Sequence, residues 1–567
     1  MQVHRVELGI RNKSRLRAAF DLHYSSISCQ IAINIVLLKQ IKTKHLFLKV
    51  RDIMVVKINT AGILGIEGRS VVCECDLSPG VARFDIVGLP DASVKESQDR
   101  VRAATKNSGY DYPFRRITVN LAPADLKKEG PVYDLAILIG IMACSGQIEP
   151  PSGDCAFIGE LSLTGEVRPV TGALPMTLAL QEAGIKKVFL PKGNAEEASH
   201  VEGIEVYPVG SITEIIDHLT GGAQLRACPP ARFAPTRGNY PDFRHVMGQK
   251  GVKRAMEIAA AGGHNILLIG PPGSGKSMMA KSLPSILPDI TPGEALETTK
   301  IYSVAGLLSP SEPIVTSRPF RSPHHTVSSV GMAGGGRIPK PGEISLAHNG
   351  VLFLDELPEF SKDSLEALRQ PLEDGKITIS RASGSRTYPG RIMLVCAMNP
   401  CRCGYYGQPG GKCTCSERSV RQYMSRVSGP LMDRIDIHVS VPAVDYDSLE
   451  RRREEEPSSE ILRRVTAARE IQQERYRGLG ISCNAQLPPS AMSLYCDTTE
   501  DAKNMLRAAF SRLGLTARSH DKILRLARTI ADLDGGGQIG LKHVAEAIQL
   551  RSLDRDSYFT QGNSYND

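Results

Sequence analysis

The sequence predicts an α/β multidomain chain with a nucleotide-binding core and a mainly helical C-terminal part. Its 567 residues are too many for one hydrophobic core, because domains usually hold roughly 100–200 residues. A glycine-rich loop lies between an apolar run and a helical stretch near the middle of the chain. Beyond it, apolar residues recur with helical periodicity. We therefore expect about three domains.

The composition is that of a globular chain. Hydrophobic residues make up 41% and charged residues 23%, and the mean hydropathy is -0.16. No run reaches the roughly 18 apolar residues of a membrane span, so we expect no membrane partner. Thirteen cysteines are too few for a disulfide scaffold of this length, and no secretory signal precedes them. The expected localisation is the reducing cytoplasm.

The first 53 residues carry most of the net charge of +8. They hold ten Lys and Arg against three Asp and Glu, which leaves 59 basic and 58 acidic residues for the remaining 514. Bulk charge therefore does not indicate a nucleic-acid partner. The segment shows no helical or strand period, so we predict an extension over 1–53, either disordered or not translated. Its Arg-rich, acid-poor composition leaves a transit peptide as an alternative.

Alternating patterns divide the rest of the chain. Strand-like runs at 71–75 and 117–121 alternate with helical stretches at 92–107 and 174–183. Later, residues 451–476 and 500–551 have helical patterns. The predicted segments are an α/β domain over 54–219, a Gly/Pro/Ala-rich linker over 220–241, an α/β core over 242–445, a helical lid over 446–552 and a flexible tail over 553–567.

The strongest motif follows a buried strand over 265–270. The loop Gly270-Pro271-Pro272-Gly273-Ser274-Gly275-Lys276-Ser277 has the GxxxxGKS spacing of a P-loop and precedes a helical stretch. Glycines let backbone N–H groups curl around phosphates, while Lys276 neutralises them and Ser277 ligates Mg²⁺. We therefore expect ATP and Mg²⁺ as cofactors.

Two further apolar strands end in polar residues. The strand over 350–354 is followed by Asp355 and Glu356, and the strand over 391–398 is followed by Asn399. Beside a P-loop, Asp355 is suited to hold Mg²⁺ and Glu356 to deprotonate the attacking water. The amide of Asn399 is suited to align that water. We expect the three strand ends to converge.

Several segments carry a family resemblance. GPPGSGKS, FRSPHHT, GEISLAHNGVLFLDELPEF, AMNPC and SGPLMDRIDIHV resemble the Mg-chelatase-like branch of the AAA+ ATPases, most closely the competence-related ComM/YifB group, over about residues 54–552. The resemblance implies a AAA+ core with a helical lid. It also implies that Arg434 is a finger reaching a neighbouring subunit's nucleotide and that Arg518 is a sensor. A guanidinium suits both roles because it is permanently charged and bidentate.

The first α/β domain resembles the proteolytic domain of Lon. The resemblance rests on KEGPVYD (128–134), GELSLTGEVRP (159–169) and AGIKKVFLP (183–191). Val132 stands where the Ser nucleophile is expected, and Leu174, Pro175 or Met176 stands where the Lys is expected. Without a nucleophile the domain cannot perform covalent catalysis, so we predict a non-proteolytic binding domain.

Basic loops are the candidate DNA contacts. A β-hairpin predicted between 370 and 395 resembles the pre-sensor hairpin of MCM-type helicases and carries Arg381 and Arg386. The glycine-rich stretch over 318–343 resembles the accompanying helix-2 insertion and carries Arg337 and Lys340. All four side chains are candidates for phosphate contact in a ring's central channel. Ordinary solvated loops are the alternative.

Four cysteines form two CxC pairs just after Asn399. Cys401, Cys403, Cys413 and Cys415 could supply a tetrahedral zinc site. The spacing is tighter than the usual CxxC knuckle, and Arg402 replaces the Pro that is usual in the resembling family. Reduced, unliganded thiols are the alternative.

The resemblance as a whole implies a ring-forming ATPase, a hexamer of this chain, that acts on branched or single-stranded DNA. Its implied role is a helicase or translocase for branch migration in recombination or natural transformation. A chelatase-type or chaperone-like ATPase that remodels a protein partner is the alternative. The basic hairpin favours DNA, whereas aromatic channel loops would favour polypeptide. An active Lon-like protease is disfavoured by Val132.

Overall fold

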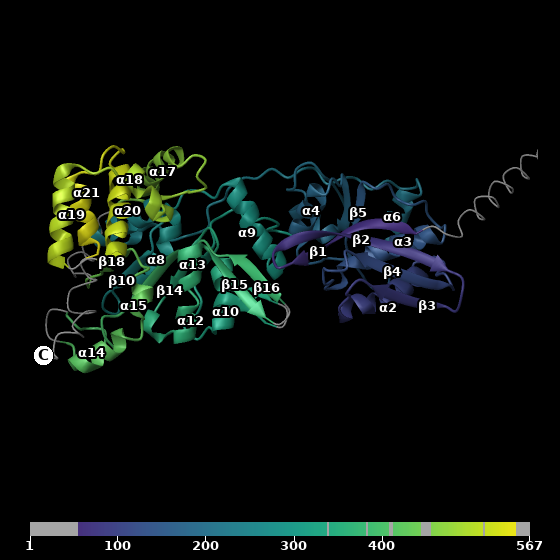
Figure 1. The fold of residues 1–567 in the computed structure, drawn as a ribbon, viewed down its shortest axis with the longest axis horizontal. Helices are drawn as coiled ribbons and strands as arrows, with labels where there is room; N and C mark the ends of the chain where they lie inside the picture. The colour runs from purple at the N-terminus through teal and green to yellow at the C-terminus, as the bar shows by residue number, and fades with distance from the viewer. Residues whose placement is uncertain are drawn as a thin grey trace, which may run out of the picture. The chain divides into compact units, whose positions relative to one another are not determined.

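The computed structural model describes residues 55–336, 339–381, 384–407, 412–443, 455–513 and 516–551. The predicted extension over 1–53 and tail over 553–567 lie outside this part of the chain. The described chain divides into two compact units. The first contains the described residues that fall within 1–60, 71–167 and 211–224, and the second contains those within 61–70, 168–210 and 225–567. Both units combine strands and helices, so the predicted mixed α/β class is confirmed (Figure 1).

The first unit is built on a sheet. It contains the first part of β1 (Val56–Leu64), the later part of β2 (Glu67–Ser78), and β3 (Arg83–Val87), β4 (Arg116–Ala122) and β5 (Cys155–Phe157). They run in the order β3-β4-β2-β1-β5, with β2 antiparallel and β3 parallel to β4. Successive side chains point to opposite faces, so Ile117, Val119 and Leu121 are all buried. The two predicted strands lie within β2 and β4.

Helices and short strands complete this unit. They are α2 (Ala92–Asn107), α3 (Asp134–Cys144), β6 (Glu160–Leu161), β7 (Val167–Arg168) and α6 (Ile212–Leu219). The predicted helix over 92–107 is confirmed, and it begins where the Asp91 side chain accepts a 2.8 Å hydrogen bond from Val94 N–H. Helix α3 is apolar on all sides and is buried along its length, as expected for a helix inside a core.

The second unit begins with a small α/β segment. It contains α4 (Ala173–Glu182), β8 (Lys187–Pro191), α5 (Ala195–Ala198) and β9 (Glu205–Val209). β8 and β9 pair in parallel. The predicted helix over 174–183 is confirmed as α4, shifted by one residue.

A parallel sheet forms the core of the second unit. Its strands are β10 (Ile266–Ile269), β11 (Phe320–Arg321), β14 (Val351–Leu354), β17 (Met393–Met398) and β18 (Ile437–Ser440). They run in the order β11-β14-β17-β10-β18, and every pair is parallel. The three central strands β14, β17 and β10 are buried along their length. Their sequences are therefore continuous apolar runs. In such sheets ligands bind beyond the carboxyl ends of the strands.

Helices flank this sheet and connect its strands. They are α7 (Lys250–Gly262), α8 (Lys276–Ser282), α9 (Pro292–Ala305), α11 (Glu343–Leu346), α12 (Lys362–Glu366), α13 (Arg369–Asp374), α14 (Glu417–Met424) and α15 (Gly429–Met432). Helix α9 begins with a capping box between Thr291 and Glu294, which satisfies amide groups at its first turn.

Two insertions leave the core sheet. The first contains α10 (Ser329–Ala333), β12 (Gly334–Gly335) and β13 (Lys340–Pro341), and the second is the hairpin of β15 (Lys376–Arg381) and β16 (Gly384–Pro389). The hairpin confirms the sequence prediction, with Ile379 opposite Arg386. The buried Tyr388 of β16 donates a 2.8 Å hydrogen bond to the carbonyl oxygen of Pro339. The two insertions therefore lie side by side.

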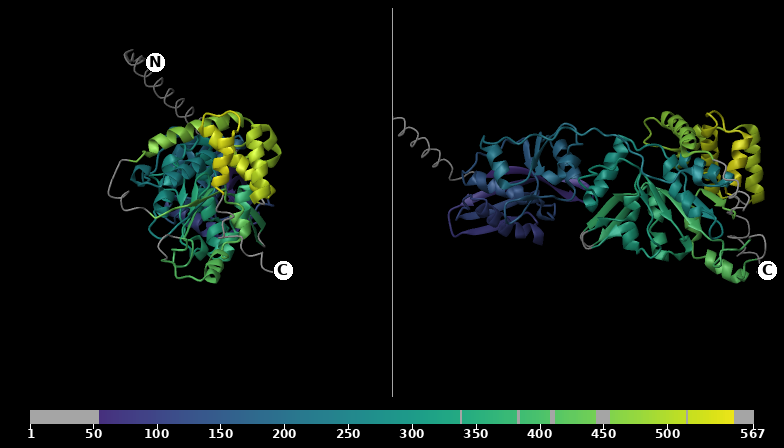
Figure 2. Two further views of the ribbon diagram at one scale, coloured as in Figure 1. Left: turned by 90° about the vertical axis from the view of Figure 1, so that its left-hand side faces the viewer. Right: turned by 180° about the vertical axis from the view of Figure 1, so that it is seen from behind.

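The C-terminal part is helical, as predicted. It contains α17 (Ser458–Arg475), α18 (Met492–Tyr495), α19 (Glu500–Leu513), α20 (Ala517–Leu533) and α21 (Leu541–Gln549), which Figures 1 and 2 show grouped together. Helix α17 begins later than residue 451 because Pro457 occupies its N-cap. Its predicted start, 451–454, lies outside the described residues. Helices α17 and α20 both pack against α7 of the core. Within the described chain, none of the helices has the length and apolarity needed to cross a bilayer.

Candidate nucleotide-binding and hydrolysis site

The loop between β10 and α8 depends on its glycines. Gly273 and Gly275 have φ angles of +76° and +88°, a region that disfavours any residue with a Cβ. A Cβ on Gly270 would overlap the carbonyl oxygen of Val441. The loop can therefore hold a sharply curved backbone whose amides face a bound phosphate.

Lys276 is the cation of this loop, and it is only 8% exposed. Its Nζ donates hydrogen bonds to the carbonyl oxygens of Gly270 and Pro271, each at 2.8 Å, and to Oδ1 of Asn399 at 3.1 Å. Burial lowers the pKa of Lys276, and the nearby Asp355 partly offsets that effect. All three acceptors of the buried ammonium group are neutral. A phosphate bound here would supply a negatively charged partner for Lys276.

Ser277 and Asp355 form the second element of the site. The Ser277 hydroxyl donates a 2.6 Å hydrogen bond to Oδ2 of Asp355, which directly follows β14. Oδ1 of Asp355 accepts a 3.0 Å hydrogen bond from the amide of Glu356. A hydroxyl and a carboxylate are hard oxygen ligands, so this pair fits Mg²⁺.

The expected convergence of strand ends is observed. Lys276 follows β10, Asp355 follows β14 and Asn399 follows β17, and these three strands are neighbours in the sheet. Parallel strands present their carboxyl ends at one edge, which explains why residues more than a hundred positions apart meet.

Glu356 also lies at this edge, but its carboxylate has a partner that sequence reasoning missed. Its backbone is left-handed, with φ +53°, and its side chain is 59% exposed. Oε2 lies 3.4 Å from Nδ1 of His325. The available signal was the FRSPHHT motif, whose histidines follow β11 and hence lie next to the strand that ends at Asp355.

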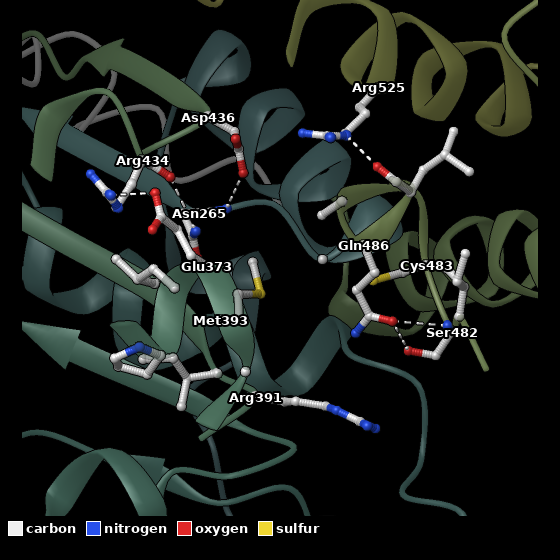
Figure 3. Close-up of a pocket in the computed structure, with 18 of the residues that line it drawn as sticks. Asn265, Glu373, Arg391, Met393, Arg434, Asp436, Ser482, Cys483, Gln486 and Arg525 are labelled. Atoms are coloured by element: carbon white, nitrogen blue, oxygen red, sulfur yellow. Dashed lines mark hydrogen bonds and ion pairs between the residues drawn. The ribbon is translucent and has the colours of Figure 1, made fainter. Parts of the chain in front are cut away.

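A cavity of about 710 Å³ opens at the opposite edge of the same sheet. Asn265, Met393 and Asp436 line it, and these residues stand at or just before the amino ends of β10, β17 and β18. Residues of the C-terminal helical part complete the lining, including Cys483 and Gln486 (Figure 3). Its basic side chains are those of Arg318, Arg391, Arg434, Arg469, Arg518, Lys522 and Arg525.

Arg434 is held by acceptors of its own chain. Its guanidinium forms an ion pair with Glu373 and donates a 2.6 Å hydrogen bond to the carbonyl oxygen of Pro430, and its side chain is 11% exposed. Figure 3 shows Arg434 and Glu373 pointing toward one another. Glu373 is a second residue that the sequence did not reveal, because α13 is more than 50 positions before Arg434.

Arg434 and Lys276 occupy opposite edges of the sheet. The carbonyl oxygen of Arg434 accepts a 3.3 Å hydrogen bond from Asn265 Nδ2 before β10, whereas the P-loop leaves the other end of β10. Four strand residues span about 13 Å at roughly 3.3 Å each. Arg434 therefore lies at the edge of the sheet opposite to the phosphate-binding loop of its own chain. Arg518 is exposed near the start of α20 and lines the same cavity as Arg434.

A buried charge cluster lies beside this cavity. Asp436 is 3.1 Å from Nζ of Lys522 and 3.7 Å from Nδ1 of His264, and it accepts a 3.1 Å hydrogen bond from the Asn265 amide. Burial opposes ionisation of Asp436, but attraction to Lys522 and the hydrogen bond with His264 outweigh it. The pKa of Asp436 is therefore held well below 3.8. The cluster links the residue before β18 to α20.

The candidate DNA contacts are described only in part. Lys340 is exposed on β13, and Arg386 is partly exposed on β16. Arg337 lies outside the described residues, and of Arg381 only the backbone, paired with Gly384, is described. The hydrogen bond from Tyr388 to Pro339 joins the hairpin to the insertion that carries Lys340.

The positions that correspond to the Lon dyad hold apolar residues. Val132 is buried in the short 3-10 helix Pro131–Tyr133 of the first unit. Leu174, Pro175 and Met176 are buried on α4 of the second unit. None of these side chains carries a nucleophilic or basic group.

Family models match most of this architecture. The model of magnesium chelatase subunit ChlI matches residues 242–449, that of its C-terminal part matches 455–551, and that of subunit ChlI of Mg-chelatase matches 73–194. The fold and the site thus define a AAA+ ATPase that uses ATP and Mg²⁺.

Similar proteins narrow this class. The chain is 42% identical to the competence protein ComM of Haemophilus influenzae over 499 residues, 87% of this chain and 96% of ComM. It is also 42% identical to the uncharacterized protein YifB of Escherichia coli over 500 residues, 88% of this chain and 97% of YifB. A segment is 30% identical to Lon protease of Rhizobium meliloti over 180 residues, 30% of this chain and 22% of Lon. The chain belongs to the Mg-chelatase-like ComM/YifB group.

Proposed function

We propose that this protein is a ring-forming, ATP-dependent DNA motor, a hexamer that drives branch migration in recombination or natural transformation. The observation that carries the proposal is the division of charged groups between two edges of one sheet. The phosphate-binding loop lies at the carboxyl edge, and Arg434 and Arg518 line a cavity at the amino edge.

This division favours assembly into a ring. Arg434 cannot stabilise a phosphate held by Lys276 of the same chain, so its complement is the nucleotide of an adjacent copy. A surface that meets a different surface of the next copy generates a closed ring when the rotation closes. The guanidinium of Arg434 forms an ion pair with Glu373 in the isolated chain. The γ-phosphate of a nucleotide bound to a neighbouring copy would compete with that carboxylate for Arg434.

The residues at the carboxyl edge have separate roles in hydrolysis. Lys276 binds the phosphates, and Ser277 and Asp355 hold the metal ion. Mg²⁺, when bound, neutralises phosphate charge. Glu356 accepts a proton from the attacking water, which Asn399 orients. Arg434 and Arg518 of the adjacent copy stabilise the charge that develops on the transferred phosphoryl group.

The two insertions support DNA as the substrate. Lys340 and Arg386 place cations on adjoining segments, as phosphate contact requires. Tyr388, the aromatic residue of the hairpin, is fully buried and is not available to grip a polypeptide. The name of the Haemophilus influenzae relative, a competence protein, also agrees with a role in transformation.

The deciding experiment compares substrates for stimulation of ATPase activity. Turnover of the full chain should rise with four-way or forked DNA above the rate in buffer alone and above the rate with an unfolded protein. Stimulation by the unfolded protein and not by DNA would instead support the alternative, a chelatase-type or chaperone-like remodelling ATPase. Lys276→Ala is the matched control, because a DNA preparation contaminated with another ATPase would still show turnover.

A further inference from the structure

Four cysteine sulfurs lie together just beyond the nucleotide site. Sγ of Cys401 is 3.3 Å from that of Cys403 and 3.8 Å from that of Cys413, and Cys403 and Cys413 are 3.6 Å apart. With Cys415, all four sulfurs fall within 4.8 Å of one another. Tetrahedral zinc with Zn–S bonds of about 2.3 Å requires S···S separations of about 3.8 Å. A disulfide would require about 2.05 Å.

One backbone amide also points at the cluster. The N–H of Tyr406 donates a 3.3 Å hydrogen bond to Sγ of Cys401. Four converging sulfurs make a closed coordination shell without an open position, as a structural zinc site requires.

The cluster differs from cysteines that serve only for packing. Cys396 on β17 is fully buried in the core, and burial raises its pKa. In the cluster, Cys401 is buried, but Cys403, Cys413 and Cys415 are partly exposed. These three side chains pack against the core without being fully buried. Packing against a core does not by itself require four sulfurs to converge on one point.

We propose that Cys401, Cys403, Cys413 and Cys415 bind one structural Zn²⁺ that fixes the loop after β17 against the P-loop. Binding displaces the thiol protons to solvent and changes no oxidation state. The inference goes beyond the proposed DNA motor and does not depend on it.

Two contacts connect this zinc site to the nucleotide loop. Gly404, between the cysteine pairs, has φ +90°, and a Cβ there would overlap the ring of Pro272 in the P-loop. Cys401 is two residues beyond Asn399, whose Oδ1 accepts the hydrogen bond from Lys276. The metal therefore holds both the backbone that touches Pro272 and the residue that contacts Lys276.

Metal content of the full chain tests the site. Protein purified without chelators should contain about one zinc per chain, and an organomercurial should release it as four thiols react. A Cys401→Ser/Cys413→Ser double variant should lose the zinc, whereas Cys228→Ser, a cysteine outside the cluster, should keep it. Metal-free wild-type protein, or zinc that survives the double variant, would overturn the proposal.

A second measurement tests the connection with the P-loop, even if the double variant does not fold. Zinc removed by a zinc-selective chelator in Mg²⁺-containing buffer should weaken binding of a fluorescent ATP analogue about tenfold, and added Zn²⁺ should restore it. Gly404→Ala should weaken binding similarly, with Gly293→Ala as the matched control. Unchanged ATP affinity in zinc-free protein would refute the positioning role. Both assays omit DNA, so their failure would leave the motor proposal intact.

Discussion

Nδ1 of His325 lies 3.4 Å from Oε2 of Glu356, the carboxylate that follows Asp355 at the end of β14. The His325 ring is itself held in place, because the His324 ring lies 4.1 Å away and Phe360 meets it edge-on. Glu356 has a left-handed backbone and an otherwise exposed side chain, so this imidazole is a contact that can orient its carboxylate. We infer that His325 positions the carboxylate of Glu356, which we propose as the base in hydrolysis.

His325→Ala should lower ATP turnover about tenfold, because a carboxylate free to rotate spends less time at the attacking water. ATP affinity should stay unchanged, since Lys276 and Ser277 are untouched. Steady-state kinetics together with a nucleotide-binding assay would separate these effects. His245→Ala, a change at an exposed histidine, is the control. Equal losses of affinity and turnover would indicate a structural role for His325.

Glu356→Gln should reduce hydrolysis by about 10²–10⁴-fold while ATP binding persists. The amide cannot accept the proton, but the phosphate and metal contacts remain. A binding titration beside a phosphate-release assay measures both quantities. Lost affinity with retained turnover would contradict the role assigned to Glu356, and Glu359→Gln in the next turn is a matched control.

Arg434→Ala should lower turnover about 10³-fold, because a guanidinium supplied in trans stabilises the transition state. Mixing this variant with Glu356→Gln should restore part of the activity. In mixed rings, an intact Glu356 in one copy meets an intact Arg434 from the next. Arg477→Ala, at an exposed position after α17, is the control. Absence of any rescue would place Arg434 outside a shared site.

Arg381→Ala/Arg386→Ala should weaken DNA binding and lower the slope of log affinity against log salt by about one unit per lost phosphate contact. ATPase activity without DNA should persist, because the hairpin carries none of the hydrolytic residues. Binding isotherms at several salt concentrations measure the slope. Arg463→Ala on α17 is the control. An unchanged slope would favour the protein-remodelling alternative.

Asp436→Asn should destabilise the second unit by about 3–5 kcal/mol at neutral pH, because it leaves Lys522 buried without its carboxylate partner. The pKa of Asp436 is lower in the folded chain than the ordinary 3.8, so its stabilising effect is present above pH 3.8 and is lost as the pH falls below that value.

Thermal unfolding across pH checks this prediction. The difference in unfolding temperature between wild type and Asp436→Asn should be largest at neutral pH and should decrease below pH 3.8. Asp521→Asn, next to Lys522 on α20, should change the unfolding temperature little. If the difference in unfolding temperature stays constant as the pH is lowered, Asp436 does not stabilise the fold through its charge.

The chemistry of the carboxyl edge follows from patterns that are local in the sequence. A P-loop has a fixed spacing, and it requires a strand before it and a helix after it, so Lys276 and Ser277 were identifiable without coordinates. Asp355 and Asn399 were identifiable because each ends a buried apolar run, and the ends of parallel strands meet at one edge. The hairpin and the four cysteines were likewise identifiable, because their signals are local in the sequence.

The distant side chains that complete these sites are visible only in the folded chain. The pairing of Arg434 with Glu373, the contact of His325 with Glu356 and the burial of Asp436 beside Lys522 join residues 31 to 86 positions apart. No periodicity encodes such pairs, because side-chain direction and loop path are set by packing among several elements. The fold also separates Arg434 from Lys276. Because β10 and β18 are parallel, the loop that follows β10 and the loop that precedes β18 lie at opposite edges of the sheet.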